Sequence, residues 1–192
     1  MKKCILLITA VLFCTQIFAQ TTWTNDPNHS RLGFTIEHMG ISEITGAFDE
    51  FSAKIILGDG QTLSHAKIQL DVTVGSINTN VEPRDKHLRS ADFFEVESYP
   101  TMRFESSSVR ETAKDTYEVK GQLDLHGVTK EVVVEMKLGG IIEDPQNPDV
   151  KTMGIQIVGT INRSDFGIGA KFPEAMLGDA VYIKADGEFK NQ

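Results

Sequence analysis

The sequence predicts an all-β fold, an eight-stranded antiparallel up-and-down barrel with a short helix between strands 3 and 4. Two observations carry this prediction. Apolar and polar residues alternate along eight segments, and this two-residue repeat is typical of half-buried strands. Short, turn-rich connections join neighbouring segments, so the strands form a meander, and a meander of eight closes most naturally into a barrel. An open sandwich is the alternative.

The first two strands are expected at residues 30–38 and 44–57. In the first, every second residue from Leu32 to Ile36 is apolar. In the second, the apolar positions slip by one residue near residues 49–50. Such a slip is typical of a β-bulge, which bends a strand sharply around a barrel. We therefore expect one continuous, bulged second strand.

The third strand is expected at residues 65–74, and a helix follows in the segment RDKHLRSADFF, residues 84–94. Pro83 can begin this helix, because the first helical turn does not use the donor that proline lacks. A projection at about 100° per residue gives the segment an inward face. That face holds Arg84, His87, Leu88, Ala91 and Phe94.

The remaining positions of this segment carry two further expectations. Asp85 and Arg89 lie four residues apart, so they are expected to pair on the outer side of the helix. Ser90 is a good N-cap, and a break in the helix there would return Phe93 to the interior.

Two roles stay open for the inward arginine and histidine. Burial of such polar groups is costly unless each has a partner. In the structural interpretation they bond to loop carbonyls and carboxylates, with Asp165 and Glu37 as available partners, and clip the helix onto the barrel mouth. In the functional interpretation they donate to the polar head of an amphipathic ligand whose tail runs into the barrel.

The last five strands follow the same alternation. His126-Gly127 joins the strand expected at residues 117–125 to the strand expected at residues 128–138. A tight hairpin needs residues that tolerate positive φ, which glycine does and histidine does better than most. The five strands are expected at residues 101–105, 117–125, 128–138, 153–161 and 181–189.

Four glycines fall on the inward parity of these strands: Gly46, Gly121, Gly159 and Gly187. Glycine weakens a strand interior, so each position needs a reason. Curvature at barrel corners and space for a ligand are the two explanations, since a barrel of eight strands is either just filled by side chains or able to hold one small ligand. The sequence leaves both open.

Residues 1–19 are expected to be a secretory signal peptide, which leaves residues 20–192 as one domain. Lys2 and Lys3 form a basic start, an apolar run follows, and Ala19 supplies a small residue at the cleavage site. The apolar run is too short for a membrane-spanning helix, which needs about 20 residues. The alternative hypothesis, that Cys14 makes this a lipoprotein signal, ranks below simple export, because such a site needs a small residue where the bulky Phe13 stands.

Composition excludes several classes of function. Both cysteines, Cys4 and Cys14, lie in the expected signal peptide, so the mature domain would hold no disulfide, cysteine metal site or thiol nucleophile. The chain has 19 basic and 27 acidic residues, a formal net charge of −8. Such a surface repels phosphate backbones, so nucleic acid is not an expected partner.

Five stretches of the mature chain form an ordered set of motifs: DPNHSRLGFTIEH, ITGAFDEF, SINTNVEPRDKHLRSADFFEVESYPTMRF, GQLDLHGVTKEV and NRSDFGI. Together they resemble the YceI-like family of exported, polyisoprenoid-binding proteins, over essentially the whole mature chain. The resemblance implies a lipocalin-like barrel around a long apolar pocket, a periplasmic location, often a dimer, and no known enzymatic activity. The residues that match the family's motifs are His29, Ser30, Arg84, Asp85, His87, Arg89, Asp92, Phe93, Phe94, Arg163, Asp165 and Phe166.

The favoured function is an exported carrier or binding protein that holds a long-chain amphiphile, a polyisoprenoid or a fatty-acid-like lipid, in the barrel. We expect no catalytic residue, metal or cofactor, no transmembrane segment in the mature chain, and a possible homodimer. The candidate ligand-binding residues are Phe34, Phe48, Phe51, Arg84, His87, Phe93, Phe94, Met102, Phe104, Ile157, Asp165 and Phe166.

Two alternatives remain. A metal-assisted hydrolase would use His29, His38, His87 and His126, with Asp165 and Glu37, as acid, base or zinc ligands, although H-E-x-x-H and G-x-S-x-G are absent. A periplasmic structural or stress-response protein would have a filled barrel and would dimerise through an outer sheet face. Val133 and Val158 fall on that outward parity.

Overall fold

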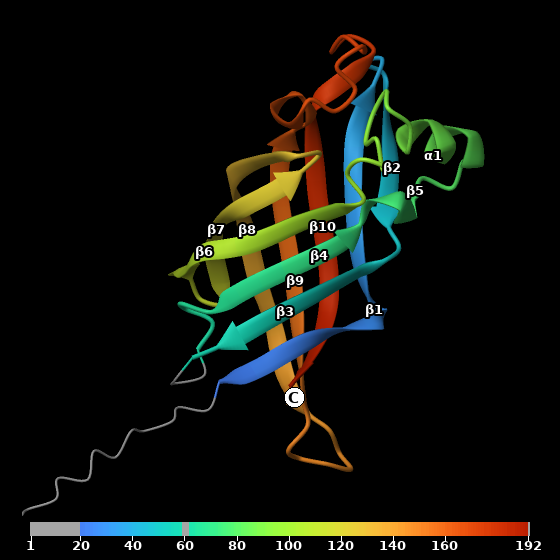
Figure 1. Ribbon diagram of the computed structural model, residues 1–192. Coiled ribbons are helices and arrows are strands. Elements are labelled where there is room, and N and C mark those ends of the chain that lie inside the picture. The colour runs from blue at the N-terminus through green and yellow to red at the C-terminus, as the bar shows by residue number, and fades with distance from the viewer. Residues whose placement is uncertain (1–19, 59–61, 192) are drawn as a thin grey trace, which may run out of the picture.

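The computed structural model describes residues 20–58 and 62–191, and the expected signal peptide lies outside them. Eight antiparallel strands form a closed ring, because the first pairs with the last. The predicted barrel is therefore confirmed (Figure 1). In ring order the strands are β1 (Thr21–His38), β3 (Phe51–Leu57), β4 (Lys67–Thr73), β6 (Thr101–Ala113), β7 (Thr116–Leu125), β8 (Val128–Glu143), β9 (Lys151–Asn162) and β10 (Leu177–Asn191).

The predicted second strand is divided in two, which corrects the expected continuous strand with a bulge. The first half of β1 pairs with β3, whereas its second half pairs with a separate strand, β2 (Ser42–Phe48). Bends at Asp49 and Glu50 part β2 from β3, and the facing chain parts at the same level into β4 and the short β5 (Ile77–Asn78). The predicted one-residue slip of the inward-facing positions is confirmed, since Phe48 and Phe51, three residues apart, both line the interior.

One end of the barrel carries most of the non-strand structure (Figure 1). We call it the helix end: it holds α1 (Glu82–Leu88), the β1–β2 turn at residues 39–41 and the segment 163–176. The opposite, terminal end holds the β8–β9 connection and the C-terminus. None of the helices in the described part of the chain has the length and apolar character needed to cross a membrane.

The hairpin turn between β7 and β8 is formed as predicted. His126 and Gly127 have φ values of 54° and 72°, and the flanking residues Leu125 and Val128 pair directly. Both turn residues thus adopt the left-handed conformation of a tight two-residue hairpin.

The helix is shorter than the predicted segment 84–94 and ends at Leu88. Pro83 lies in its first turn, as expected. The break at Ser90 is confirmed: the Ser90 hydroxyl accepts a hydrogen bond from the backbone N–H of Asp92 at 3.3 Å. Phe93 then returns to the interior and is only 8% exposed.

The expected Asp85–Arg89 pair is wrong, because both side chains turn back to the segment before the helix. Asp85 is 4% exposed and accepts hydrogen bonds from the backbone N–H and the hydroxyl of Thr79. The Arg89 guanidinium donates to the carbonyls of Gly75 and Ile77. The polar groups of residues 75–79, on either side of β5, bind these side chains more strongly than an exposed ion pair would.

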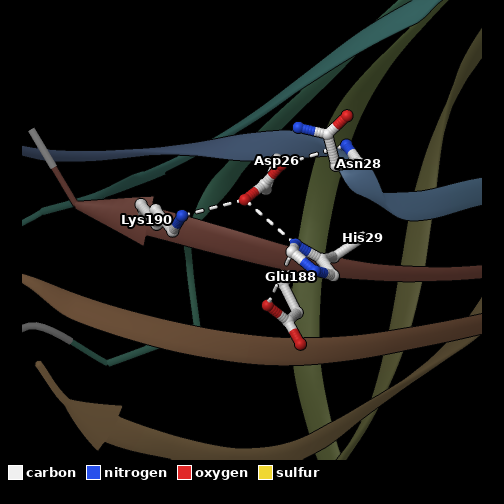
Figure 2. A network of polar contacts seen from close by, with 5 residues as sticks. All are labelled: Asp26, Asn28, His29, Glu188 and Lys190. Atoms are coloured by element: carbon white, nitrogen blue, oxygen red, sulfur yellow. Dashed lines mark hydrogen bonds and ion pairs between the residues drawn. The ribbon is translucent and has the colours of Figure 1, made fainter.

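A polar network joins β1 to β10 near the terminal end, where the register of β1 shifts (Figure 2). The Asp26 carboxylate accepts hydrogen bonds from Lys190 Nζ at 2.8 Å, His29 Nδ1 at 3.2 Å and the Asn28 backbone N–H at 3.0 Å. These bonds, above all that from Lys190, hold the pKa of Asp26 far below its ordinary value. Only 11% of the Asp26 side chain is exposed.

We expect Asp26→Asn to weaken the acid dependence of stability. A carboxyl whose pKa is lower in the folded state stabilises the fold above its unfolded pKa of about 4, and this stabilisation is lost as the pH falls towards the folded pKa. The wild-type melting temperature should therefore fall more steeply below about pH 4 than that of the variant. Thermal unfolding from neutral to acidic pH measures this.

The matched control is Asp71→Asn, which removes a carboxylate that is 60% exposed and pairs with Arg103. This control should keep the wild-type slope. Equal slopes for all three proteins would show that Asp26 does not govern acid stability.

Candidate functional site

The barrel encloses a cavity of about 430 Å³. All eight strands of the ring contribute to its walls, with further side chains from β2, β5, α1 and the segment 163–176. The walls are overwhelmingly apolar. This volume falls within the roughly 300–1,000 Å³ typical of pockets for small ligands.

Strand parity shows that side chains do not fill the barrel. Phe34, Phe104, Val134, Ile157 and Ile183 all lie on inward positions and line the cavity. In a filled core such side chains would be almost fully buried, as Val109 and Met153 are, neither of which lines the cavity. Instead these five are only partly buried. The filled-barrel alternative therefore conflicts with the geometry of the middle of the barrel.

The inward glycines have a third explanation besides curvature and ligand space. A Cβ atom on Gly46 would clash with the ring of Phe34, and one on Gly121 would clash with the ring of Phe104. Both rings therefore lie across a neighbouring strand at a point where no side chain projects, as in aromatic rescue of glycine in sheets. The volume that glycine leaves is taken by the aromatic walls.

The structure brings most of the predicted site residues together around the cavity. Those that line it are Phe34, Phe48, Phe51, Arg84, His87, Phe93, Phe94, Met102, Phe104 and Ile157. Asp165 and Phe166 do not line it. Both belong to the 3-10 helix η2 (Arg163–Phe166), of which only Arg163 lines the cavity. Asp165 forms an exposed ion pair with Lys130 at 2.5 Å, and Phe166 is 1% exposed in the core of the helix end.

Arg84 links α1 to the residue that follows β5. Its Nε donates to the Thr79 hydroxyl at 2.7 Å, and its Nη2 donates to the Thr79 carbonyl at 2.9 Å. The expected partners Asp165 and Glu37 are thus wrong for this residue. Within residues 20–58 and 62–191, Nη1 of Arg84 makes no hydrogen bond, so one edge of the guanidinium stays available at the cavity wall.

His87 lies at the cavity wall in a small aromatic and charged cluster. Its ring packs edge-on against Phe93 at 5.0 Å and Phe172 at 5.9 Å between centroids. Its Nε2 lies 3.2 Å from Asp92, which also pairs with Lys171. The bond from Lys171, and then that from His87, hold the pKa of Asp92 below its usual value. This cluster joins α1 to the segment 163–176.

Arg163 is a structural residue whose partners the sequence did not reveal. It is 6% exposed, and its guanidinium donates to backbone carbonyls only. Those carbonyls belong to Ile168, Gly169, Phe172, Leu177 and Gly178. This side chain therefore fixes the path of the segment 163–176. Phe172, in this segment, and Leu177, the first residue of β10, line the cavity from that path. Because the segment lacks strand alternation, periodicity could not identify Phe172.

The cavity reaches the surface at the helix end. Met176 lines the cavity and is 50% exposed. At the terminal end, Trp23, Leu63 and Met153 are each at most 5% exposed and do not line the cavity. They pack together in the core cluster that closes this end of the barrel. A ligand would therefore enter beside α1 and the segment 163–176.

Three of the four histidines of the hydrolase alternative have different bonding partners. His29 belongs to the Asp26 network, His87 bonds to Asp92, and His126 lies 2.8 Å from the Phe166 carbonyl through Nδ1. No group of three or more potential metal ligands occurs in the part of the chain that the structure describes. His29, His87 and His126 therefore do not share a hydrogen-bonded site, whereas His38 lines the barrel cavity together with His87.

Comparison with known proteins agrees with this architecture. The chain is 35% identical to the UPF0312 protein SA2479 of Staphylococcus aureus (strain N315), over 88% of this chain and 97% of that protein. The solved YCEI protein of Campylobacter jejuni superposes with a TM-score of 0.71 at 28% identity, over 80% of this chain and 88% of that one.

A more distant structure shares the fold alone. A polyisoprenoid binding domain from Saccharophagus degradans, implicated in plant cell wall breakdown, has a TM-score of 0.67 at 17% identity, over 89% of this chain and 98% of that one. The family model of the YceI-like domain matches residues 23–189, from the start of β1 to near the end of strand β10. With this match over nearly the whole barrel, the chain belongs to the YceI-like domain family.

Proposed function

We propose that the protein binds one long-chain amphiphile, an isoprenoid or a fatty-acid-like lipid, inside the barrel. The apolar cavity with its partly uncovered walls carries this proposal. Each methylene group that moves from water into such a site contributes about 0.8 kcal/mol. A long chain would therefore bind tightly with few polar contacts.

The polar head of this ligand would lie at the helix end. The available polar groups there are Nη1 of Arg84, the His87 ring and the His38 side chain, all at the cavity wall. An isoprenoid is the first candidate because a YceI-like fold of this kind occurs in the polyisoprenoid binding domain from Saccharophagus degradans. The shared fold supports that choice.

Binding, rather than catalysis, is the function that this geometry supports. The cavity brings together walls for a chain and a few donors for a head, without a nucleophile, base and oxyanion donor in mutual contact. We further propose that the protein acts in the periplasm after removal of residues 1–19. That placement rests on the expected signal peptide and the family resemblance.

Native mass spectrometry of the purified protein is expected to show a bound long-chain amphiphile. Extraction with organic solvent should remove it, and the extracted protein should then take up one prenyl alcohol or fatty acid per chain. The apolar lining predicts that affinity rises by about 0.8 kcal/mol for each added methylene until the cavity is full.

The control is a short, water-soluble alcohol, which should not bind measurably. A reproducibly empty barrel that takes up no prenyl or fatty chain after extraction would contradict the proposed function.

A further inference from the structure

We propose that the mouth of the barrel docks on the surface of a lipid bilayer without net charge, through three exposed apolar side chains. We call these the apolar rim: Met39, Ile41 and Met176. The proposal rests on the proposed function, because it names the surface from which the lipid would enter. It concerns the outer surface of the helix end and not the ligand-lining walls.

The apolar rim exposes large side chains where polar ones are usual. Met39, Ile41 and Met176 are 54%, 84% and 50% exposed. Two of them lie in the tight β1–β2 turn, a setting where Gly, Asn, Asp, Ser and Pro dominate. Met39 has a φ of 56°, which is uncommon for a residue other than glycine. A turn that accepts this conformation and still presents two large apolar side chains indicates contact with an apolar medium.

Backbone hydrogen bonds hold the rim together. The Met39 N–H donates to the Met176 carbonyl at 3.0 Å, and the Ile41 N–H donates to the His38 carbonyl at 3.3 Å. His38 in turn pairs with Leu177 across β1 and β10. The three side chains therefore project from a connected backbone platform and need no rearrangement before they meet a surface.

The rim is continuous with the cavity wall. Met176 belongs to both, and the next side chains inward, His38, Ile44 and Leu177, line the cavity. Exposed apolar patches that border a binding cavity mark interaction sites. When the rim is inserted among lipid tails, a chain can pass from the bilayer into the barrel with little exposure to water.

Charge selects the kind of bilayer. Glu37 and Glu43 flank the turn on β1 and β2, and Glu174 lies two residues before Met176. None of these three carboxylates forms an ion pair with another described residue. Anionic membranes attract basic segments, so acidic neighbours favour a surface of zwitterionic lipids.

The test is Ile41→Asp with vesicles of phosphatidylcholine and phosphatidylethanolamine. Co-sedimentation and the rate of transfer of a fluorescent fatty acid from vesicle to protein should each fall at least tenfold. Uptake of the same fatty acid from dilute solution should stay within twofold of wild type, because Ile41 does not line the cavity. The matched control is Ile142→Asp, an equal change at a 69% exposed position of β8 towards the terminal end, which should alter neither measurement.

A second reporter is Ile41→Trp. The only tryptophan of the wild-type chain, Trp23, is 3% exposed, so an added indole at the rim dominates any change on vesicle addition. Its emission should shift to the blue with neutral vesicles and shift less with anionic ones.

Four outcomes would overturn the docking proposal: no vesicle binding by the wild type, an equal loss for both aspartate variants, a parallel loss of uptake from solution in Ile41→Asp, or no blue shift. Dissociation of a dimer by Ile41→Asp without any vesicle effect would assign the rim to a second copy of the chain and would also overturn it. Vesicle binding by a wild type that takes up no chain from solution would support docking while contradicting the proposed function.

Discussion

Arg163→Ala is expected to lower the free energy of unfolding by about 3–5 kcal/mol. The substitution leaves five backbone carbonyls of the segment 163–178 without their donor, and an unsatisfied buried acceptor costs about 1–3 kcal/mol. Water entering the helix end would compensate some of them, so the total stays below the full sum. Urea unfolding followed by fluorescence and circular dichroism measures the change.

The same variant should also release a bound chain faster. Arg163 fixes the path on which Phe172 and Leu177 reach the cavity wall, so loss of that path opens the mouth. Arg103→Ala is the matched control: Arg103 is 66% exposed in a surface pair with Asp71, and its loss should change stability by less than about 1 kcal/mol. A loss below about 1 kcal/mol for Arg163→Ala as well would contradict the structural role of Arg163.

Ala185→Phe is expected to abolish binding of a long chain while leaving the barrel folded. Ala185 is an inward, partly buried residue of β10 that lines the cavity opposite Leu32 and Ile157 on the neighbouring strands. The larger side chain enters space that the ligand would occupy. We expect at least a tenfold loss of affinity, about 1.4 kcal/mol, and a matching loss of co-purified lipid.

The stability of Ala185→Phe distinguishes an open cavity at this position from a filled core. Insertion into a well-packed core costs about 1–3 kcal/mol, whereas a phenyl group in open space should cost less than that or stabilise the empty protein. Ala113→Phe makes the same change at an exposed position at the end of β6 and should leave binding unchanged. Unaltered lipid content in Ala185→Phe would mean that the chain binds elsewhere.

The barrel was predictable because its signal is local. Alternation from Leu32 to Ile36 and along the later strands depends only on which side chains need burial, and His126-Gly127 fixes the turn by its backbone preferences. The change of face near Asp49 was visible for the same reason. Whether this change produces two strands or one bulged strand depended on the neighbouring chain, which divides into β4 and β5 at the same level.

The helix segment was predictable in direction but not in partners. The projection placed Arg84, His87 and Phe94 at the cavity wall, where the structure has them. It failed for Ala91, which is exposed because the helix ends at Leu88. It also failed for Asp85 and Arg89, because helical spacing says which side chains are neighbours on a helix but not which backbone groups elsewhere lack partners.

The sequence by itself determined an antiparallel barrel with apolar walls, a helix at one end and a set of aromatic residues facing inward. Only the tertiary structure decided that these walls leave a cavity, that Phe34 and Phe104 take up the space above Gly46 and Gly121, and that the mouth lies beside Met176. The physical reason is that burial direction is a property of each strand, whereas free volume depends on how side chains from strands far apart in the sequence meet across the barrel.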